Sequence, residues 1–343
     1  MLNPGLRRVW RDPATVQFGV DVPDPVLLTG VDDDTADLLR RLDGSREWPD
    51  VVATTATADH PADATEELLQ RLSASNLLID AAGWPGGKPL TAQGRARLAP
   101  DLAAAATHSG AAAPAKRCER LAQAAVTIVG VGRLGAVLAS LLTASGVGRL
   151  DLRDKATVDA SDMCVGGFTP ADAGTVRQDL GRTLEQWQCV ARTNAPSALT
   201  IVTDVSDTRA LSGQLFATAT PHLMVSCSEA IGRIGPFVLP GQSACMRCID
   251  LARGDNDAGW PKVAVQVQNR AGDRACDSNL AISTAALAAV HVTSWLAGGK
   301  PSSVNGIVEL HLPDGEATCR TARFHPACGC QWPNPIPRET MAP

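Results

Sequence analysis

The sequence predicts an α/β protein in which a Rossmann-like layer with a zinc clasp follows a small winged-helix-like domain. Three observations support this prediction. An apolar run enters a glycine-rich turn at residues 126–135, two pairs of cysteines lie far apart in the second half of the chain, and the first 97 residues carry strand and helix patterns of their own. A chain of 343 residues is also long enough for two domains.

The glycine-rich turn is the most informative stretch. Residues 126–129 are β-branched, and Gly130, Gly132 and Gly135 then match G-x-G-x-x-G. Behind the turn, apolar residues recur with helical spacing at Leu134, Val137, Leu138, Leu141 and Leu142. A strand, a glycine turn and a helix in this order can hold a phosphate on the free N–H groups of the helix N-terminus. A plain strand-to-helix turn is the alternative.

Two acidic residues follow later predicted strands. Asp154 ends the strand at 149–154 and lies about twenty residues after the glycine turn, where an acid can bind a ribose hydroxyl. Asp151 lies earlier in the same strand, and its alternative role is purely structural. Asp204 ends another predicted strand at 199–204. Asp154 is therefore the ribose candidate.

The front of the chain, residues 1–97, is expected to be a separate winged-helix-like domain. Residues 16–20, 26–28 and 77–80 have strand patterns, and residues 32–42 and a segment that begins near Asp63 have helical ones. A packing or dimerisation module is the alternative, and the acidic first helix argues against DNA binding. The alanine-rich stretch at 103–116 indicates a linker or a loose helix followed by a loop, which places a linker at 98–118. The Rossmann-like domain is expected at 119–332 and a tail at 333–343.

Composition excludes several classes of function. Hydrophobic residues make up 45% of the chain and charged residues 20%, which is typical of globular proteins. The net charge is −5 and there is no long basic run, so we expect no nucleic-acid partner. Neither a signal-peptide core nor a membrane-spanning run is present, which predicts a cytoplasmic protein.

The cysteines predict a metal site. Cys245 and Cys248 form C-x-x-C, Cys328 and Cys330 form C-x-C, and together they can supply the four sulfurs of a closed tetrahedral zinc site. A closed site has no open position, so we expect a structural zinc. A redox pair or free thiols are the alternatives, and His325 is the alternative ligand. Of the other cysteines, Cys276 is the candidate nucleophile, since it lies in a polar segment before the last apolar helix.

The order of these motifs resembles the ThiF/MoeB family, the ubiquitin-activating-type adenylyltransferases, over about residues 119–332. The resemblance implies that the chain binds ATP and magnesium, adenylates the C-terminus of a peptide or small carrier protein, and forms a homodimer. It places Gly130, Gly132 and Gly135 at the phosphates, Asp154 at the ribose and Asp204 at the magnesium.

The chain departs from the family pattern at its basic residues. The family has a glycine where Arg133 stands, and Ser161-Asp162-Met163-Cys164 lacks the arginine of the Ser-Asn-x-x-Arg-Gln element. The lysine expected near residues 178–180 is missing too. Arg133, Arg177 and Arg182 are candidates to replace these cations, and Arg133 and Cys276 are the candidate catalytic residues.

The front domain and the ending at residues 325–330 are similar to the ThiF-like partners of YcaO cyclodehydratases, which bind leader peptides during natural product biosynthesis. This similarity implies a precursor-peptide partner, a cyclodehydratase partner and a degenerate adenylation centre. Three hypotheses follow: a peptide-binding protein, an active ATP-dependent adenylyltransferase, and an NAD-dependent oxidoreductase that leaves the paired cysteines unexplained.

Overall fold

The computed structural model describes residues 1–56, 61–81, 84, 90–109, 113–203, 208–268 and 275–331. The chain divides into two compact units. The first contains Met1–Arg120 and Cys189–Ala191, and the second contains Leu121–Gln188 and Arg192–Pro343.

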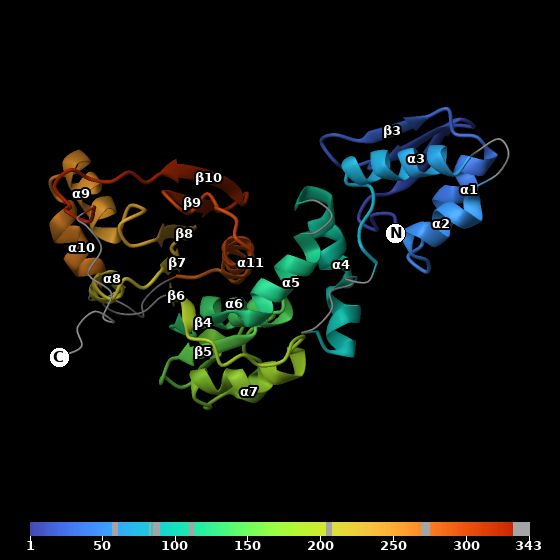
Figure 1. The fold of residues 1–343 in the computed structure, drawn as a ribbon. Coiled ribbons are helices and arrows are strands. Elements are labelled where there is room, and N and C mark those ends of the chain that lie inside the picture. The colour runs from blue at the N-terminus through green and yellow to red at the C-terminus, as the bar shows by residue number, and fades with distance from the viewer. Residues whose placement is uncertain are drawn as a thin grey trace, which may run out of the picture. The chain divides into compact units, whose positions relative to one another are not determined.

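The first unit is built on a small antiparallel sheet with the order β1-β2-β3, formed by Arg8–Asp12, Thr15–Phe18 and Val26–Thr29. Three helices follow: α1 (Asp33–Arg41), α2 (Trp48–Thr55) and α3 (Ala62–Ala74) (Figure 1). Val16 and Phe18 of β2 pack with Leu38, Leu69 and Leu72 in the core of this unit. Asp32 caps α1 by accepting a hydrogen bond from the N–H of Thr35.

The structure adds elements that the sequence pattern did not indicate and removes one that it did. Strand β1 and helix α2 are additional, whereas residues 77–80 form only an isolated bridge between Leu2 and Leu78. The expected linker at 98–118 is largely helical, because α4 spans Ala92–Ser109 and α5 spans Ala113–Gln123. The helical alternative for the alanine-rich stretch fits these elements, since alanine favours helix, and the linker boundaries stay a prediction. The winged-helix-like assignment of this unit stays a prediction.

The second unit contains a seven-stranded sheet in the order β10-β9-β8-β7-β6-β4-β5. Four strands are parallel: β4 (Ala125–Val129), β5 (Arg149–Arg153), β6 (Ser197–Thr203) and β7 (His222–Ser228). Three continue it antiparallel: β8 (Ile231–Val238), β9 (Gly306–His311) and β10 (Glu316–Thr321). This mostly parallel sheet confirms the predicted α/β fold class.

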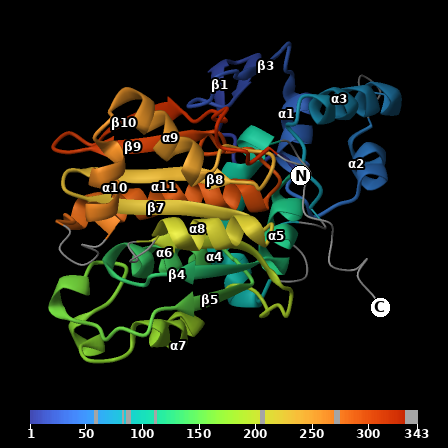
Figure 2. The same ribbon diagram turned by 90° about the vertical axis from the view of Figure 1, so that its left-hand side faces the viewer.

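Helices cover both faces of this sheet. Helix α6 (Arg133–Ala144) packs on α11 (Ser278–Leu296), which also contacts β7 and β8. On the other face, α8 (Thr208–Ala217) packs on α9 (Met246–Asn256), and α10 (Trp260–Gln268) follows α9 (Figure 2). The short helix α7 (Leu180–Leu184) lies beside β5. Helix α11 is long and apolar enough to cross a membrane, but half of it is buried against these partners, as in a core helix.

Candidate functional site

The glycine turn lies between the end of β4 and the start of α6, as the sequence predicts. Gly130 has a φ of +91°, which favours glycine. A Cβ atom on Gly135 would lie 2.2 Å from the carbonyl oxygen of Gly130, so helix and turn can approach this closely only without a side chain. Gly132 is the N-cap of α6 and has no side-chain cap, which leaves this helix N-terminus available to an anion.

Asp154 is joined to the glycine turn by hydrogen bonds. Its Oδ2 atom accepts from the N–H of Val131 at 2.8 Å, and its Oδ1 atom accepts from the N–H of Ala156 at 3.0 Å. The side chain is 13% exposed. The acid therefore lies at the carboxyl edge of the sheet next to the turn, and its role in ribose binding stays a prediction.

Arg177 is the basic residue that the structure places at this acid. Its Nη1 atom lies 3.4 Å from Asp154 Oδ2, and its Nε and Nη2 atoms donate to Asp162 at 2.9 and 2.8 Å. Burial would lower the pKa of Arg177, but the hydrogen bonds and charges of Asp162 and Asp154 outweigh burial and raise it. Of the three arginines that sequence reasoning offered as replacements for the missing cations, Arg177 is the one beside the ribose candidate. Arg182, in α7, faces Asp179 at 3.7 Å instead.

Arg133 joins two segments of the second unit. Its Nε donates to the carbonyl of Ser161 at 2.8 Å, and its Nη1 donates to the carbonyl of Cys276 at 2.8 Å and to Ser278 Oγ at 3.2 Å. Cys276 is partly buried two residues before α11 and forms an isolated bridge with Glu229. Catalytic roles for Arg133 and Cys276 stay predictions, and Asp204 lies outside the described residues.

The four predicted zinc ligands come together. Cys245 Sγ lies 3.9 Å from Cys248 Sγ and 3.5 Å from Cys328 Sγ, and Cys248 Sγ lies 3.4 Å from Cys330 Sγ. All four sulfurs lie within 4.8 Å of one another and are buried. Four sulfurs at about 2.3 Å from a tetrahedral zinc would be separated by about 3.8 Å. The cluster therefore fits a zinc ion.

Electrostatics within the cluster are consistent with a cation among the sulfurs. Burial and neighbouring thiols raise the pKa of Cys328 to about 11 and also raise that of Cys330. Burial opposes ionisation of Cys248 as well, but hydrogen bonds, the first from the N–H of His325, lower its pKa. A divalent cation would offset the charge of the thiolates. The His325 ring faces Asp255 at 2.8 Å, so the four cysteines form the ligand set without it.

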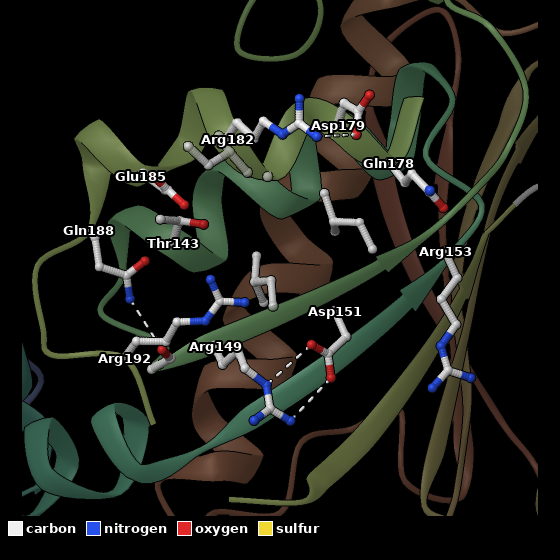
Figure 3. A pocket seen from close by; sticks show the side chains of 15 residues that line it. Thr143, Arg149, Asp151, Arg153, Gln178, Asp179, Arg182, Glu185, Gln188 and Arg192 are labelled. Atoms are coloured by element: carbon white, nitrogen blue, oxygen red, sulfur yellow. Dashed lines mark hydrogen bonds and ion pairs between the residues drawn. The ribbon is translucent and has the colours of Figure 1, made fainter. Parts of the chain in front are cut away.

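A cavity of about 620 Å³ lies along β5, next to α7 (Figure 3). Its charged side chains largely pair with one another, since Arg149 faces Asp151 at 3.2 Å and Arg182 faces Asp179. The residues predicted to bind a nucleotide do not line it. It is therefore separate from the site at the glycine turn.

The first unit has a smaller cavity of about 270 Å³ beside β3. Among the described strands, β3 pairs only with β2, so its other edge lies free next to this cavity. Leu28, Leu38 and Leu68 give the cavity an apolar lining, and Asp34 and Arg71 add opposite charges. A free strand edge beside an apolar cavity has the features needed to accept an extended chain.

Part of the sequence is similar to known proteins. Residues 106–181 match the ThiF family model. Ubiquitin-like modifier-activating enzyme 5 is 44% identical over 59 residues in Drosophila ananassae and 41% identical over 61 residues in Arabidopsis thaliana. These matches cover 17% and 18% of this chain, and only 15% and 14% of the respective enzymes.

The fold comparisons cover nearly the whole chain. The structure of E. coli MccB with AMPCPP and MccA is similar with a TM-score of 0.70 and 14% identity, over 96% of this chain and 98% of MccB. The structure of PaaA is similar with a TM-score of 0.66 and 18% identity, over 94% of this chain and 99% of PaaA. The chain therefore contains a ThiF family domain and shares the fold of MccB and PaaA.

Proposed function

We propose that this chain binds a precursor peptide and presents it to a partner modifying enzyme, a cyclodehydratase. The observation that carries the proposal is the free edge of β3 beside the cavity between β3, α1 and α3. An added strand gains affinity from main-chain hydrogen bonds along β3 and specificity from side chains that enter the cavity. E. coli MccB, whose fold is similar over most of the chain, has been solved with its peptide MccA, which supports a peptide ligand.

The proposal includes a structural zinc at the four cysteines, a homodimer, a cytoplasmic location and a degenerate adenylation centre. The last part is supported by the contacts of Asp154. Both carboxylate oxygens already accept N–H hydrogen bonds, and Arg177 lies against one of them. These contacts take about three of the four acceptor positions of the carboxylate, so only one remains for the hydroxyls of a ribose.

A selection experiment tests peptide binding although the sequence of the natural peptide is unknown. Random 20-residue peptides displayed on their mRNA would be selected on the full chain, and bound peptides measured by fluorescence anisotropy. We expect binding to protect residues 26–29 from hydrogen–deuterium exchange, because an added strand engages the β3 backbone. Failure of the selection, or protection elsewhere with β3 unchanged, would reject strand addition.

A matched pair of substitutions in α3 tests the cavity. Ala64→Trp would fill the cavity that Ala64 lines, and we expect it to weaken peptide binding at least about tenfold. Ala74→Trp is the control, because Ala74 is exposed at the end of the same helix and does not line the cavity. Equal losses in the two variants would contradict the assignment.

The alternative function is ATP-dependent adenylation of the C-terminus of a peptide or small carrier protein. The observation that favours it is Arg177, a cation 3.4 Å from Asp154 near the N-terminus of α6. In such a reaction a carboxylate attacks the α-phosphate of ATP and pyrophosphate leaves. A cation placed at the developing charge would stabilise the transition state.

Exchange of radiolabelled pyrophosphate into ATP separates the two functions. The binding-only proposal predicts no exchange above background, with or without a selected peptide. Sustained exchange that Asp154→Ala or Asp204→Ala abolishes would establish adenylation instead. A titration of ATP with magnesium, followed by calorimetry, would show whether nucleotide binds when exchange is absent.

A further inference from the structure

A third cavity, of about 440 Å³, lies on the face of the large sheet that carries α8 and α9. The apolar part of its wall is formed by Met224, Val225, Met246, Ile249 and Ile307. Three arginines also line it: Arg209 from α8, Arg233 from β8 and Arg253 from α9. Glu229 and Asp250 line it as well, so the cavity combines an apolar surface with three positive and two negative side chains.

Two of the three nearby carboxylates, those of Asp250 and Glu309, are already hydrogen bonded to other groups. Asp250 accepts from Arg209 at 2.6 and 3.0 Å and from the indole N–H of Trp260 at 3.1 Å. Glu309, whose side chain is 8% exposed, receives hydrogen bonds from both Arg233 and Arg320 at 2.7–2.9 Å. The third carboxylate, Glu229, also lines the cavity, but it is exposed and forms no hydrogen bond with these arginines among the described residues. With Arg320, four arginines therefore face three carboxylates, and one positive charge remains.

Arg253 carries that remaining charge. Its guanidinium lies 4.6 Å from the ring centroid of Trp260, and no carboxylate among the described residues hydrogen bonds to it. Burial, followed by the like charges of Arg233 and Arg320, lowers its pKa, and the charges of Asp250 and Glu309 offset this only in part. An anion that enters the cavity and pairs with the guanidinium would offset both the burial and the like charges.

We propose that this cavity binds a peptide segment through an aspartate or glutamate side chain whose carboxylate pairs with Arg253. A guanidinium matches a carboxylate in shape and can donate two hydrogen bonds to it, and the apolar walls strengthen the pair by excluding water. The same walls bury the aliphatic part of the acidic residue and its neighbours. The inference rests on the proposed function, since it requires that the chain bind a peptide, and it adds the chemical class that the second unit selects.

The test uses random 12-residue peptides selected in parallel on the wild-type chain, Arg253→Gln and Arg247→Gln. Arg247 is the matched control, because it is exposed on the same helix and does not line the cavity. We expect wild-type and Arg247→Gln pools to be enriched in aspartate or glutamate at one position, and the Arg253→Gln pool to lose that enrichment. Arg253→Lys should retain a weaker enrichment, which separates loss of the charge from loss of the fold.

A synthetic peptide from the wild-type pool then locates the interaction. Replacing its acidic residue by the amide should weaken binding at least about tenfold to the wild type and have no further effect on Arg253→Gln. Amidation of its C-terminus should change nothing. If binding is lost when only the C-terminus is amidated, the side-chain assignment is overturned in favour of the terminal carboxylate.

Other outcomes distinguish this inference from the proposed function. Peptides whose affinity falls for Ala64→Trp but is unchanged for Arg253→Gln would overturn this inference and leave strand addition at β3 intact. Peptides that depend on Arg253 but not on the β3 cavity would support it and reject strand addition. Equal acidic preference in all three pools would overturn it, as would an empty selection, which removes the proposed function as well.

Discussion

Arg177 is the residue whose contacts best define the region behind the glycine turn. It donates to Asp162 and lies against Asp154, and the two acidic side chains are only 7% and 13% exposed. Without the guanidinium, two nearly buried carboxylates would lose their counter-ion. We expect Arg177→Gln to lower the free energy of unfolding by about 2 kcal/mol, since hydrogen bonds to charged groups contribute about 1.5–3 kcal/mol.

Urea denaturation would measure this loss, and Arg182→Gln is its control. Arg182 is 82% exposed and lies 3.7 Å from Asp179, so its removal should change the free energy of unfolding by less than about 0.5 kcal/mol. Equal effects at the two positions would show that Arg177 is an ordinary surface arginine.

A substitution at Gly135 would test how closely α6 approaches the glycine turn. A methyl group there would lie 2.2 Å from the Gly130 carbonyl oxygen, which is a backbone atom and cannot rotate away. We expect Gly135→Ala to lower the free energy of unfolding by about 1–3 kcal/mol, as overpacking does. Gly213→Ala in α8 meets no atom within 4 Å and should instead raise it by up to about 1 kcal/mol. Thermal unfolding should show that Gly135→Ala is less stable and Gly213→Ala more stable than the wild type if the contact at Gly135 is as close as described.

The residues that the sequence identified at this site are those with a local signature. Gly130 and Gly135 could be predicted because their spacing reflects a backbone requirement within a few residues. Arg177 was one of three arginines that sequence position could not separate. Its selection depends on Asp154 and Asp162, which different loops bring to one place, and no short pattern encodes that arrangement.

At the scale of elements, the predictable parts are those with a clear apolar period. Strand β4 and helix α6 were recognised because they are buried and regular. Strand β1 was missed because all five of its residues are exposed, so no alternation marks it. Helix α4 overlaps a stretch that was predicted to be a linker or a loose helix, because an alanine run is compatible with both. The period of apolar residues reflects which side chains are buried. An element that buries few side chains therefore cannot be predicted from that period.

The zinc clasp connects elements that are distant in sequence. Cys245 is the N-cap of α9, Cys248 lies in its first turn, and the other two sulfurs come from the segment after β10. We expect about one zinc per chain, and we expect Cys248→Ser to lower the melting temperature by on the order of 10 °C, because structural zinc contributes folding energy. Cys319→Ser is the control, since Cys319 is exposed and is not one of the four clustered cysteines.

Metal analysis and calorimetry on the same samples check this prediction. Full zinc content with unchanged stability in Cys248→Ser would refute a four-sulfur site. A metal-free wild type of equal stability would refute the zinc itself. Loss of zinc should also disturb Arg253, because the clasp holds the start of the helix that carries it.

At the scale of the whole molecule, the two units have separate hydrophobic cores. Leu69 and Val16 belong to the core of the first unit, whereas Ile128 and Leu138 belong to that of the second. The four sulfurs lie in the second unit alone. Two separate cores are expected to unfold with some independence, so zinc should stabilise only one of them.

Differential scanning calorimetry of the full chain would test whether the two units unfold independently. We predict two transitions, of which a strong chelator lowers only the one that belongs to the second unit. Leu69→Ala, which deletes a side chain that is 1% exposed in the first unit, should lower only the other transition, by about 2–5 kcal/mol of unfolding free energy. A single transition that moves equally under both perturbations would mean that the two cores unfold as one cooperative body, and peptide binding at β3 would then depend on the zinc.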